Sequence, residues 1–119
     1  MHRDLPTPER ESHWIFSLHL GEDPTVYKKY MADKIPDPDV VLFADFGLAD
    51  NGQGKLHIQG LYVDRRRNPN LPQLHELWGI KPAQGNFSRI VTKRQRSDYS
   101  DYLESRGTKE RKKFGRLIE

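Results

Sequence analysis

The stretch Val40–Asp64, VVLFADFGLADNGQGKLHIQGLYVD, decides the fold because it reads as two β-strands joined by a turn. Its first strand opens with the apolar run Val40–Phe43, and β-branched and aromatic residues of this kind favour a pleated, half-buried surface. Asp50-Asn51-Gly52 has the chemistry of a turn, since Asn and Gly tolerate positive φ. Strand character resumes at Leu56, so the sequence predicts an antiparallel hairpin.

Polar side chains within this hairpin are candidate functional groups. Side chains alternate along a strand, so His57 and Gln59 share one face of the sheet. A turn centred on Asn51 places Asp45 directly opposite His57, with the two Cβ atoms roughly 5 Å apart. A two-residue loop at Asn51-Gly52 shifts the pairing by one residue. In the first register Asp45, His57 and Gln59 converge on one patch.

The chemistry of these three side chains suits a metal ion. A carboxylate, an imidazole and an amide oxygen form a mixed oxygen and nitrogen set. Such a set favours Mn²⁺ or Mg²⁺ over structural Zn²⁺. The alternative is a polar, solvent-facing side of an antiparallel sheet, which is common. The hairpin alone leaves both interpretations open.

Hydrophobic periodicity and a helix cap predict the elements before the hairpin. Apolar side chains alternate along residues 13–20, which indicates a strand with His19 on its polar side. Asp23 is a candidate N-cap with a proline directly after it, so we expect a helix at 21–34. The stripe expected to face the core consists of Val26, Tyr27, Tyr30 and Met31.

The second half of the chain carries shorter patterns. Leu74, Leu77 and Trp78 give an amphipathic helix its apolar side. In chain order we expect a short helix at 71–79, a strand at 80–84, a turn at 85–86, a loop or short strand at 87–92 and a helix at 93–106.

Length and composition exclude several classes of protein. The 119 residues fit one domain with a modest core. Lys and Arg number 20 against 17 Asp and Glu, and this net charge of +3 is compatible with nucleic acid without demanding it. The absence of cysteine excludes disulfides, thiolate metal sites and cysteine nucleophiles. No apolar run approaches a membrane span of about 20 residues, so we expect a soluble intracellular protein.

Three segments are candidates for contact with a charged partner. Arg65-Arg66-Arg67 follows the hairpin, and either phosphate contact or solvated charge explains it. Residues 1–12 are polar and contain two prolines, so we expect a flexible N-terminal arm. Residues 108–119 are basic, and we expect a C-terminal tail or linker there.

The run His57-Ile58-Gln59-Gly60 resembles the second motif of the Rep proteins of circular single-stranded DNA viruses, such as circoviruses and nanoviruses. These proteins belong to the HUH endonuclease superfamily. Their motif reads His-hydrophobic-Gln followed by Gly, and an upstream acidic residue, whose place Asp45 occupies, completes the metal site. Residues 16–20 are similar to the first motif, Phe-Thr-Leu-Asn-Asn. Ser17 replaces Thr conservatively there, whereas His19 and Leu20 depart from the two Asn.

The third motif of the family is Tyr-x-x-Lys on a helix, and its Tyr attacks a DNA phosphate. Tyr102 is the favoured match, because Gly107 has the five-residue spacing from the Tyr that family members often show. Ser105 then stands where the family has Lys, with Arg106 as a candidate substitute. Tyr99 is the fallback nucleophile.

The resemblance implies an α+β, RRM-like domain over residues 13–107, in which a central antiparallel sheet with packed helices presents the metal site. The expected order β-α-β-β-α-β-α agrees with this HUH endonuclease fold. The implied function is a replication-initiator endonuclease that nicks single-stranded DNA at an origin stem-loop, forms a 5′-phosphotyrosine intermediate and rejoins strands. Mn²⁺ or Mg²⁺ is the expected cofactor, held by Asp45, His57 and Gln59.

Two further expectations accompany this reading. Rep proteins of this type usually continue into a helicase domain, so we expect such a domain to be fused to this chain or missing from it. If the protein is viral, we expect it to act in the host nucleus. The alternative function is a non-catalytic RRM-like nucleic-acid-binding module, which keeps the sheet and its basic rim without forming a covalent link.

Overall fold

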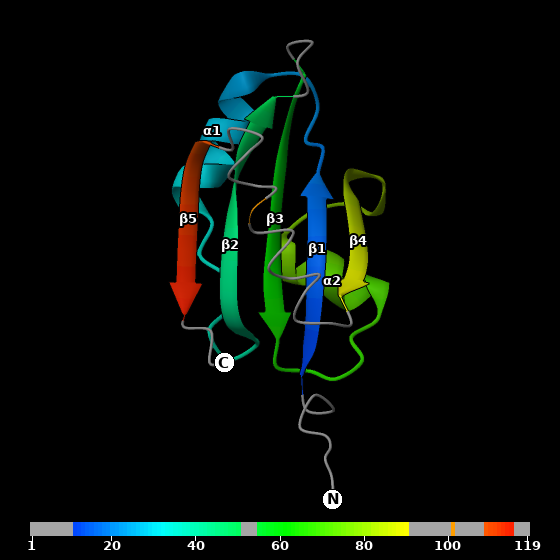
Figure 1. Cartoon of the computed structure of the whole chain (residues 1–119). Coiled ribbons are helices and arrows are strands. Elements are labelled where there is room, and N and C mark those ends of the chain that lie inside the picture. The colour runs from blue at the N-terminus through cyan, green and yellow to red at the C-terminus, as the bar shows by residue number, and fades with distance from the viewer. Residues whose placement is uncertain (1–10, 51–54, 91–100, 102–108, 116–119) are drawn as a thin grey trace, which may run out of the picture.

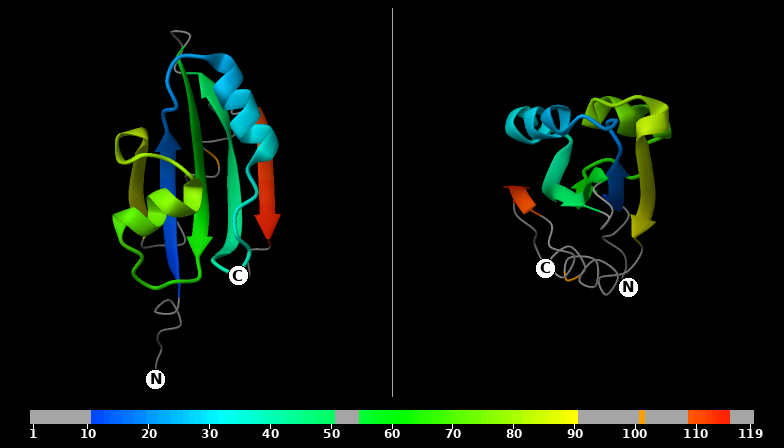
Figure 2. Two further views of the ribbon diagram at one scale, coloured as in Figure 1. Left: turned by 180° about the vertical axis from the view of Figure 1, so that it is seen from behind. Right: turned by 90° about the horizontal axis from the view of Figure 1, so that it is seen from above.

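In the part of the chain that the structure describes, one antiparallel sheet carries the helices at 24–33 and 71–78 on the same face. The computed structural model describes residues 11–50, 55–90, 101 and 109–115. Within them the strand order is β4-β1-β3-β2-β5 (Figure 1). The strands are β1 (Ser12–Leu18), β2 (Val41–Asp50), β3 (Leu56–Asp64), β4 (Gly85–Ile90) and β5 (Lys109–Gly115); the helices are α1 (Pro24–Asp33), α2 (Leu71–Trp78) and the 3₁₀ helix η2 (Pro82–Gln84). The view from above in Figure 2 shows α1 and α2 side by side over one face. The architecture is α+β and is compatible with an RRM-like fold.

Local capping explains where the two α-helices begin. The Asp23 side chain accepts a hydrogen bond from the Thr25 amide at 2.9 Å, as expected for the N-cap of α1. Asn70 and Gln73 form a reciprocal capping box at the start of α2. Tyr27 and Met31 of the predicted stripe are buried, but Val26 is 43% exposed, so its assignment to the core is wrong. No helix in the described part of the chain is long and apolar enough to cross a membrane.

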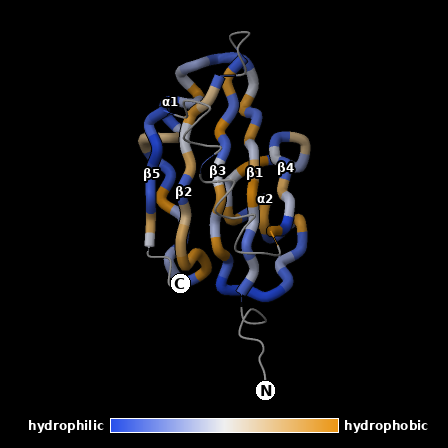
Figure 3. Tube along the Cα trace, viewed as in Figure 1, coloured by the Kyte–Doolittle hydropathy of each residue, from blue (hydrophilic) through white to orange (hydrophobic). Residues whose placement is uncertain are grey.

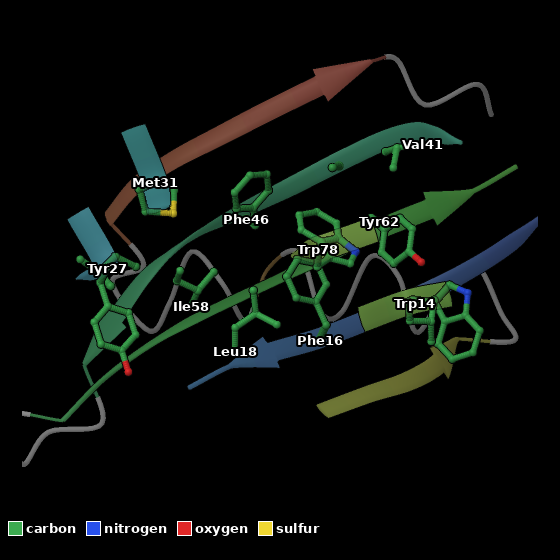
Figure 4. Close-up of a cluster of buried hydrophobic side chains, with 13 residues drawn as sticks. Trp14, Phe16, Leu18, Tyr27, Met31, Val41, Phe46, Ile58, Tyr62 and Trp78 are labelled. Carbon is green, nitrogen blue, oxygen red and sulfur yellow. The ribbon is translucent and has the colours of Figure 1, made fainter. Parts of the chain in front are cut away.

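The core lies between the sheet and the two helices, and aromatic rings dominate it (Figure 4). The ring of Trp78 on α2 lies 4.4 Å from Phe16, 5.2 Å from Phe46 and 5.2 Å from Tyr62, measured between centroids. Gly60 makes this packing possible, because a Cβ there would stand 2.4 Å from the Cβ of Phe46. The glycine that follows the His-x-Gln run therefore has a packing reason of its own.

The segment after α2 differs from the prediction. Residues 80–84 do not form a strand: Pro82–Gln84 is a 3₁₀ turn, and the expected turn at 85–86 is the start of β4. Proline cannot donate to a ladder, and the Gln84 side chain accepts from the Lys81 amide at 2.8 Å, which closes the turn. The short strand expected as one alternative at 87–92 is confirmed as far as Ile90. Of the helix expected at 93–106, only Asp101 lies within the described residues, and its backbone is helical.

The expected C-terminal tail is also corrected. Lys109–Gly115 forms the edge strand β5, which pairs with β2, so this part of residues 108–119 belongs to the folded domain. Figure 3 shows β5 as a mostly hydrophilic strand, and its charge hid the strand pattern in the sequence. Two contacts anchor it on the helix side: Phe114 stacks on Phe46 at 6.0 Å, and the Lys112 ammonium donates to the Met31 carbonyl at 2.7 Å.

Candidate functional site

The predicted metal ligands all lie on the sheet face turned away from α1 and α2, which we call the distal face. Phe46 of β2 and its partner Gly60 of β3 point toward the helices. Because side chains alternate, Asp45, His57 and Gln59 point to the other side. The prediction that His57 and Gln59 share a face is therefore confirmed, and Asp45 shares it with them.

The register of the hairpin differs from the one expected, however. His57 pairs with Ala49, and Asp45 pairs with Leu61, so the expected opposition of Asp45 and His57 is wrong. The ladder continues to the pair Asp50–Leu56, so Asp50 belongs to a strand and not to the turn. The two rungs are four positions apart on β3, from His57 to Leu61, which corresponds to about 13 Å along the strand. Residues 51–54 of the connection lie outside the described residues.

Asp45 contacts Arg111 on the neighbouring edge strand. The carboxylate is buried, and its Oδ1 and Oδ2 accept from Arg111 Nε at 3.1 Å and Nη2 at 2.5 Å. A bidentate pair of this kind neutralises the carboxylate and fixes its orientation. In this arrangement both oxygens that a cation would need are engaged by a guanidinium. Sequence reasoning missed Arg111, although Arg111 and Lys113 alternate with Lys112 and Phe114 at strand spacing.

His57 and Gln59 contact each other directly. His57 Nε2 lies 3.0 Å from Gln59 Oε1, and His57 is half-buried while Gln59 is buried. An amide oxygen can only accept, so Nε2 carries the hydrogen in this arrangement. In the neutral form of this tautomer, Nδ1 of His57 carries no hydrogen and is an acceptor.

This spacing fits a bound divalent cation. Two ligand atoms on neighbouring corners of an octahedron with bonds of about 2.1 Å stand about 3.0 Å apart. A cation at a right angle between the two atoms would lie off the line that joins them, so it could replace the shared hydrogen once the imidazole turned Nε2 toward it. Nowhere in the described residues, the distal face included, do three His, Asp or Glu side chains gather closely enough to hold a metal ion. A site on the distal face thus depends on the amide oxygen of Gln59.

His19 joins this end of the distal face from beyond the end of β1. Its ring stacks on the His57 ring, with centroids 5.6 Å apart and planes inclined by 22°. The His19 amide donates to the Gln84 carbonyl at 2.7 Å, which holds the backbone there. Partial burial of the ring lowers the pKa of His19, and the charge of His57 lowers it further. The sequence placed His19 on the correct side of the strand but could not show that His57 is its neighbour.

The arginine run lies at the other end of β3. Arg66 is engaged within the protein, since its guanidinium donates twice to Asp64, at 2.9 Å in each case. Arg65 and Arg67 are exposed. Arg89 joins them by donating to the Arg67 carbonyl at 2.8 Å. Contact of these arginines with phosphate remains a prediction.

The two tyrosines that the sequence offers as candidate nucleophiles are not among the described residues. Tyr99 and Tyr102 lie outside the described residues, as do Ser105, Arg106 and Gly107. Their assignment as catalytic residues stays a prediction from the sequence.

No family model matches this sequence, and no curated protein matches it.

Proposed function

We propose that the protein is a metal-dependent endonuclease of the HUH type, which nicks single-stranded origin DNA and rejoins strands, as a viral replication initiator does. The observation that carries the proposal is the contact between His57 Nε2 and Gln59 Oε1, 3.0 Å long, on the distal face of β3. The two residues form the His-x-Gln run that resembles the Rep motif. Their spacing also matches two ligand atoms on one cation.

The surroundings of this pair support binding of a single strand. The sheet carries exposed basic side chains at two rims: Arg65 and Arg67 at the exit of β3, and Lys109 and Lys113 on β5. Basic side chains at a sheet rim attract a nucleic-acid backbone. An α+β sheet domain compatible with an RRM-like fold provides the platform.

In the proposed mechanism His57 and Gln59 would hold Mn²⁺ or Mg²⁺. The bound cation would polarise the scissile phosphate and neutralise its developing charge. Asp45, the third ligand that the sequence predicts, adds a carboxylate to the same face, but Arg111 engages both of its oxygens.

Tyr102, or Tyr99 in its place, would supply the nucleophile. An unperturbed phenol has a pKa of about 10, so attack requires a base to take the proton, and a nearby cation would favour this by stabilising the phenolate. The phenolic oxygen forms a bond to phosphorus, and the bond from phosphorus to the 3′ oxygen breaks. The departing oxygen takes up a proton and becomes a free 3′-hydroxyl. Attack by another 3′-hydroxyl on the 5′-phosphotyrosine reverses these changes and rejoins a strand.

The decisive experiment is a search for the covalent adduct. The chain is incubated with Mn²⁺ and a labelled pool of single-stranded stem-loops whose loop sequence is randomised. We expect a protein–DNA band that resists SDS and heat and that disappears with EDTA. Retarded mobility in a native gel without this band would instead indicate a non-catalytic nucleic-acid-binding module.

Substitutions then assign the roles. Tyr102→Phe should abolish the adduct and leave DNA binding nearly intact, because only the reacting hydroxyl is removed. If Tyr99→Phe abolishes it instead, the nucleophile is Tyr99 and the function stands. His57→Ala should lose Mn²⁺ binding and cleavage together, and His75→Ala on α2 is the matched control. Cleavage by His57→Ala that still requires Mn²⁺ would contradict the role of His57.

A further inference from the structure

Two imidazoles and an amide oxygen come together at one end of the distal face. The ring centroids of His19 and His57 are 5.6 Å apart, and His57 Nε2 contacts Gln59 Oε1 at 3.0 Å. The three side chains come from neighbouring strands of the sheet, since β1 pairs with β3 directly. His19 is exposed, so its side chain can turn without disturbing the core.

The separation of the two rings fits one shared cation. With metal–nitrogen bonds of about 2.1 Å, each ring centroid lies about 3.2 Å from the metal. Two imidazoles on one metal then have centroids about 4.6 Å apart at a right angle and about 6.5 Å apart when opposite. The observed 5.6 Å falls between these limits, but the rings are stacked with planes inclined by only 22°. A metal lies in the plane of each imidazole that it binds, so the exposed His19 ring would have to turn for both rings to face one ion.

Asp45 is poorly placed for the same cation. It pairs with Leu61, whereas His57 pairs with Ala49, so about 13 Å of strand separates the two rungs. Arg111 engages both carboxylate oxygens. A shift of Asp45 toward the imidazoles would break two charge-assisted hydrogen bonds and leave the half-buried Arg111 guanidinium without this carboxylate.

We propose that His19, and not Asp45, completes the metal site with His57 and Gln59. This inference deepens the proposed function, because it names the third ligand of the same site. The resulting set of two imidazoles and one amide carries no negative charge. Nitrogen ligands without carboxylate favour first-row transition metals over Mg²⁺. Asp45 then acts as the partner of Arg111 and holds the edge strand.

Metal affinity measured without DNA tests the proposal. Binding of Mn²⁺ to the full chain is followed by the electron paramagnetic resonance of the free ion. We expect His19→Ala to raise the Kd for Mn²⁺ by at least about tenfold. Even the loss of a residue that only supports a metal ligand typically lowers metal affinity by about tenfold or more. Asp45→Asn should leave the Kd nearly unchanged, and so should the matched control His75→Ala. Mg²⁺ should compete weakly.

A rescue variant guards against a structural explanation. His19→Asp replaces one ligand by a hard oxygen ligand, so it should retain Mn²⁺ binding while His19→Ala loses it. Melting without metal checks that each variant is folded. The proposal is overturned if the wild-type chain binds no Mn²⁺, if His19→Ala binds it as the wild type does, if His19→Asp fails to restore binding, or if Asp45→Asn weakens binding more than His19→Ala.

The adduct assay separates this proposal from the function on which it rests. An adduct that forms in the wild type, together with unchanged Mn²⁺ affinity in His19→Ala, rejects His19 as a ligand and keeps the endonuclease. Absence of any adduct, together with Mn²⁺ binding that requires His19, rejects the endonuclease and keeps the metal site.

Discussion

Two buried carboxylates, Asp64 and Asp45, each pair with an arginine, but they lie on opposite faces of the sheet. Asp64 faces the helices and accepts from Arg66, two residues away, and from the Tyr62 hydroxyl at 2.9 Å. Asp45 lies on the distal face and accepts from Arg111, 66 residues away. The pair of Asp64 and Arg66 is local to the end of β3. The pair of Asp45 and Arg111 requires β5 to dock beside β2. The same chemistry therefore secures a strand exit in one case and a tertiary contact in the other.

The largest expected effect is the loss of Asp64. Asp64→Ala removes a fully buried acceptor of the Arg66 guanidinium, the Arg66 amide and the Tyr62 hydroxyl. Breaking a buried ion pair typically costs about 3–5 kcal/mol. Urea unfolding should show this loss as a lower free energy of unfolding for the whole domain. Asp39→Ala, at an exposed aspartate, is the control and should change stability little.

Loss of the pair between Asp45 and Arg111 should lower the free energy of unfolding by less, and the effect should be concentrated in β5. Arg111→Met leaves Asp45 without its partner, but detachment of the edge strand would let water reach the carboxylate. We expect a loss of about 1.5–3 kcal/mol, the usual contribution of a hydrogen bond to a charged group. Hydrogen exchange should show lost protection in β5 and retained protection in β1 and β3. Equal effects from Lys113→Met, on the exposed part of the same strand, would contradict a specific role for Arg111.

A third variant tests the helix-facing anchor of β5. Lys112 donates to the carbonyls of Met31 and Lys34 at 2.7 and 3.1 Å, where α1 ends. A cation there satisfies free carbonyls and complements the helix dipole. Lys112→Met should cost about 1.5 kcal/mol in thermal or urea unfolding. Additivity with Arg111→Met in the double variant would show that the two anchors act independently; strong coupling would show that either one alone docks the strand.

The smallest expected effect concerns Tyr62 beside Asp64. Burial raises the pKa of the Tyr62 hydroxyl above its ordinary value of 10.0, and the charge of Asp64 raises it further. A raised folded-state pKa means that the stabilisation is complete below pH 10 and is lost as the pH rises above it. Tyr62→Phe should cost about 1 kcal/mol at pH 7 and should reduce the loss of stability above pH 10. An unchanged alkaline profile would contradict this role.

Much of the fold could be read from local sequence patterns. Alternation predicted β1, β3 and their faces, a capping residue predicted α1, and the spacing of apolar residues predicted α2, because these signals act within a few residues. The register of the hairpin and the strand β5 could not be read in this way. Asn51-Gly52 resembles a tight turn, yet pairing of Asp50 with Leu56 requires a longer connection. The charge of residues 109–115 obscured an edge strand that long-range contacts stabilise.

For the candidate site, the sequence by itself determined which side chains face away from the helices, because strand parity fixes the face of His57, Gln59 and Asp45. Only the tertiary structure decided which of them meet. The pairing of β1 with β3 brings His19 to His57, and the docking of β5 brings Arg111 to Asp45. Neighbours across a sheet depend on strand order and register, and contacts between residues far apart in the chain set both.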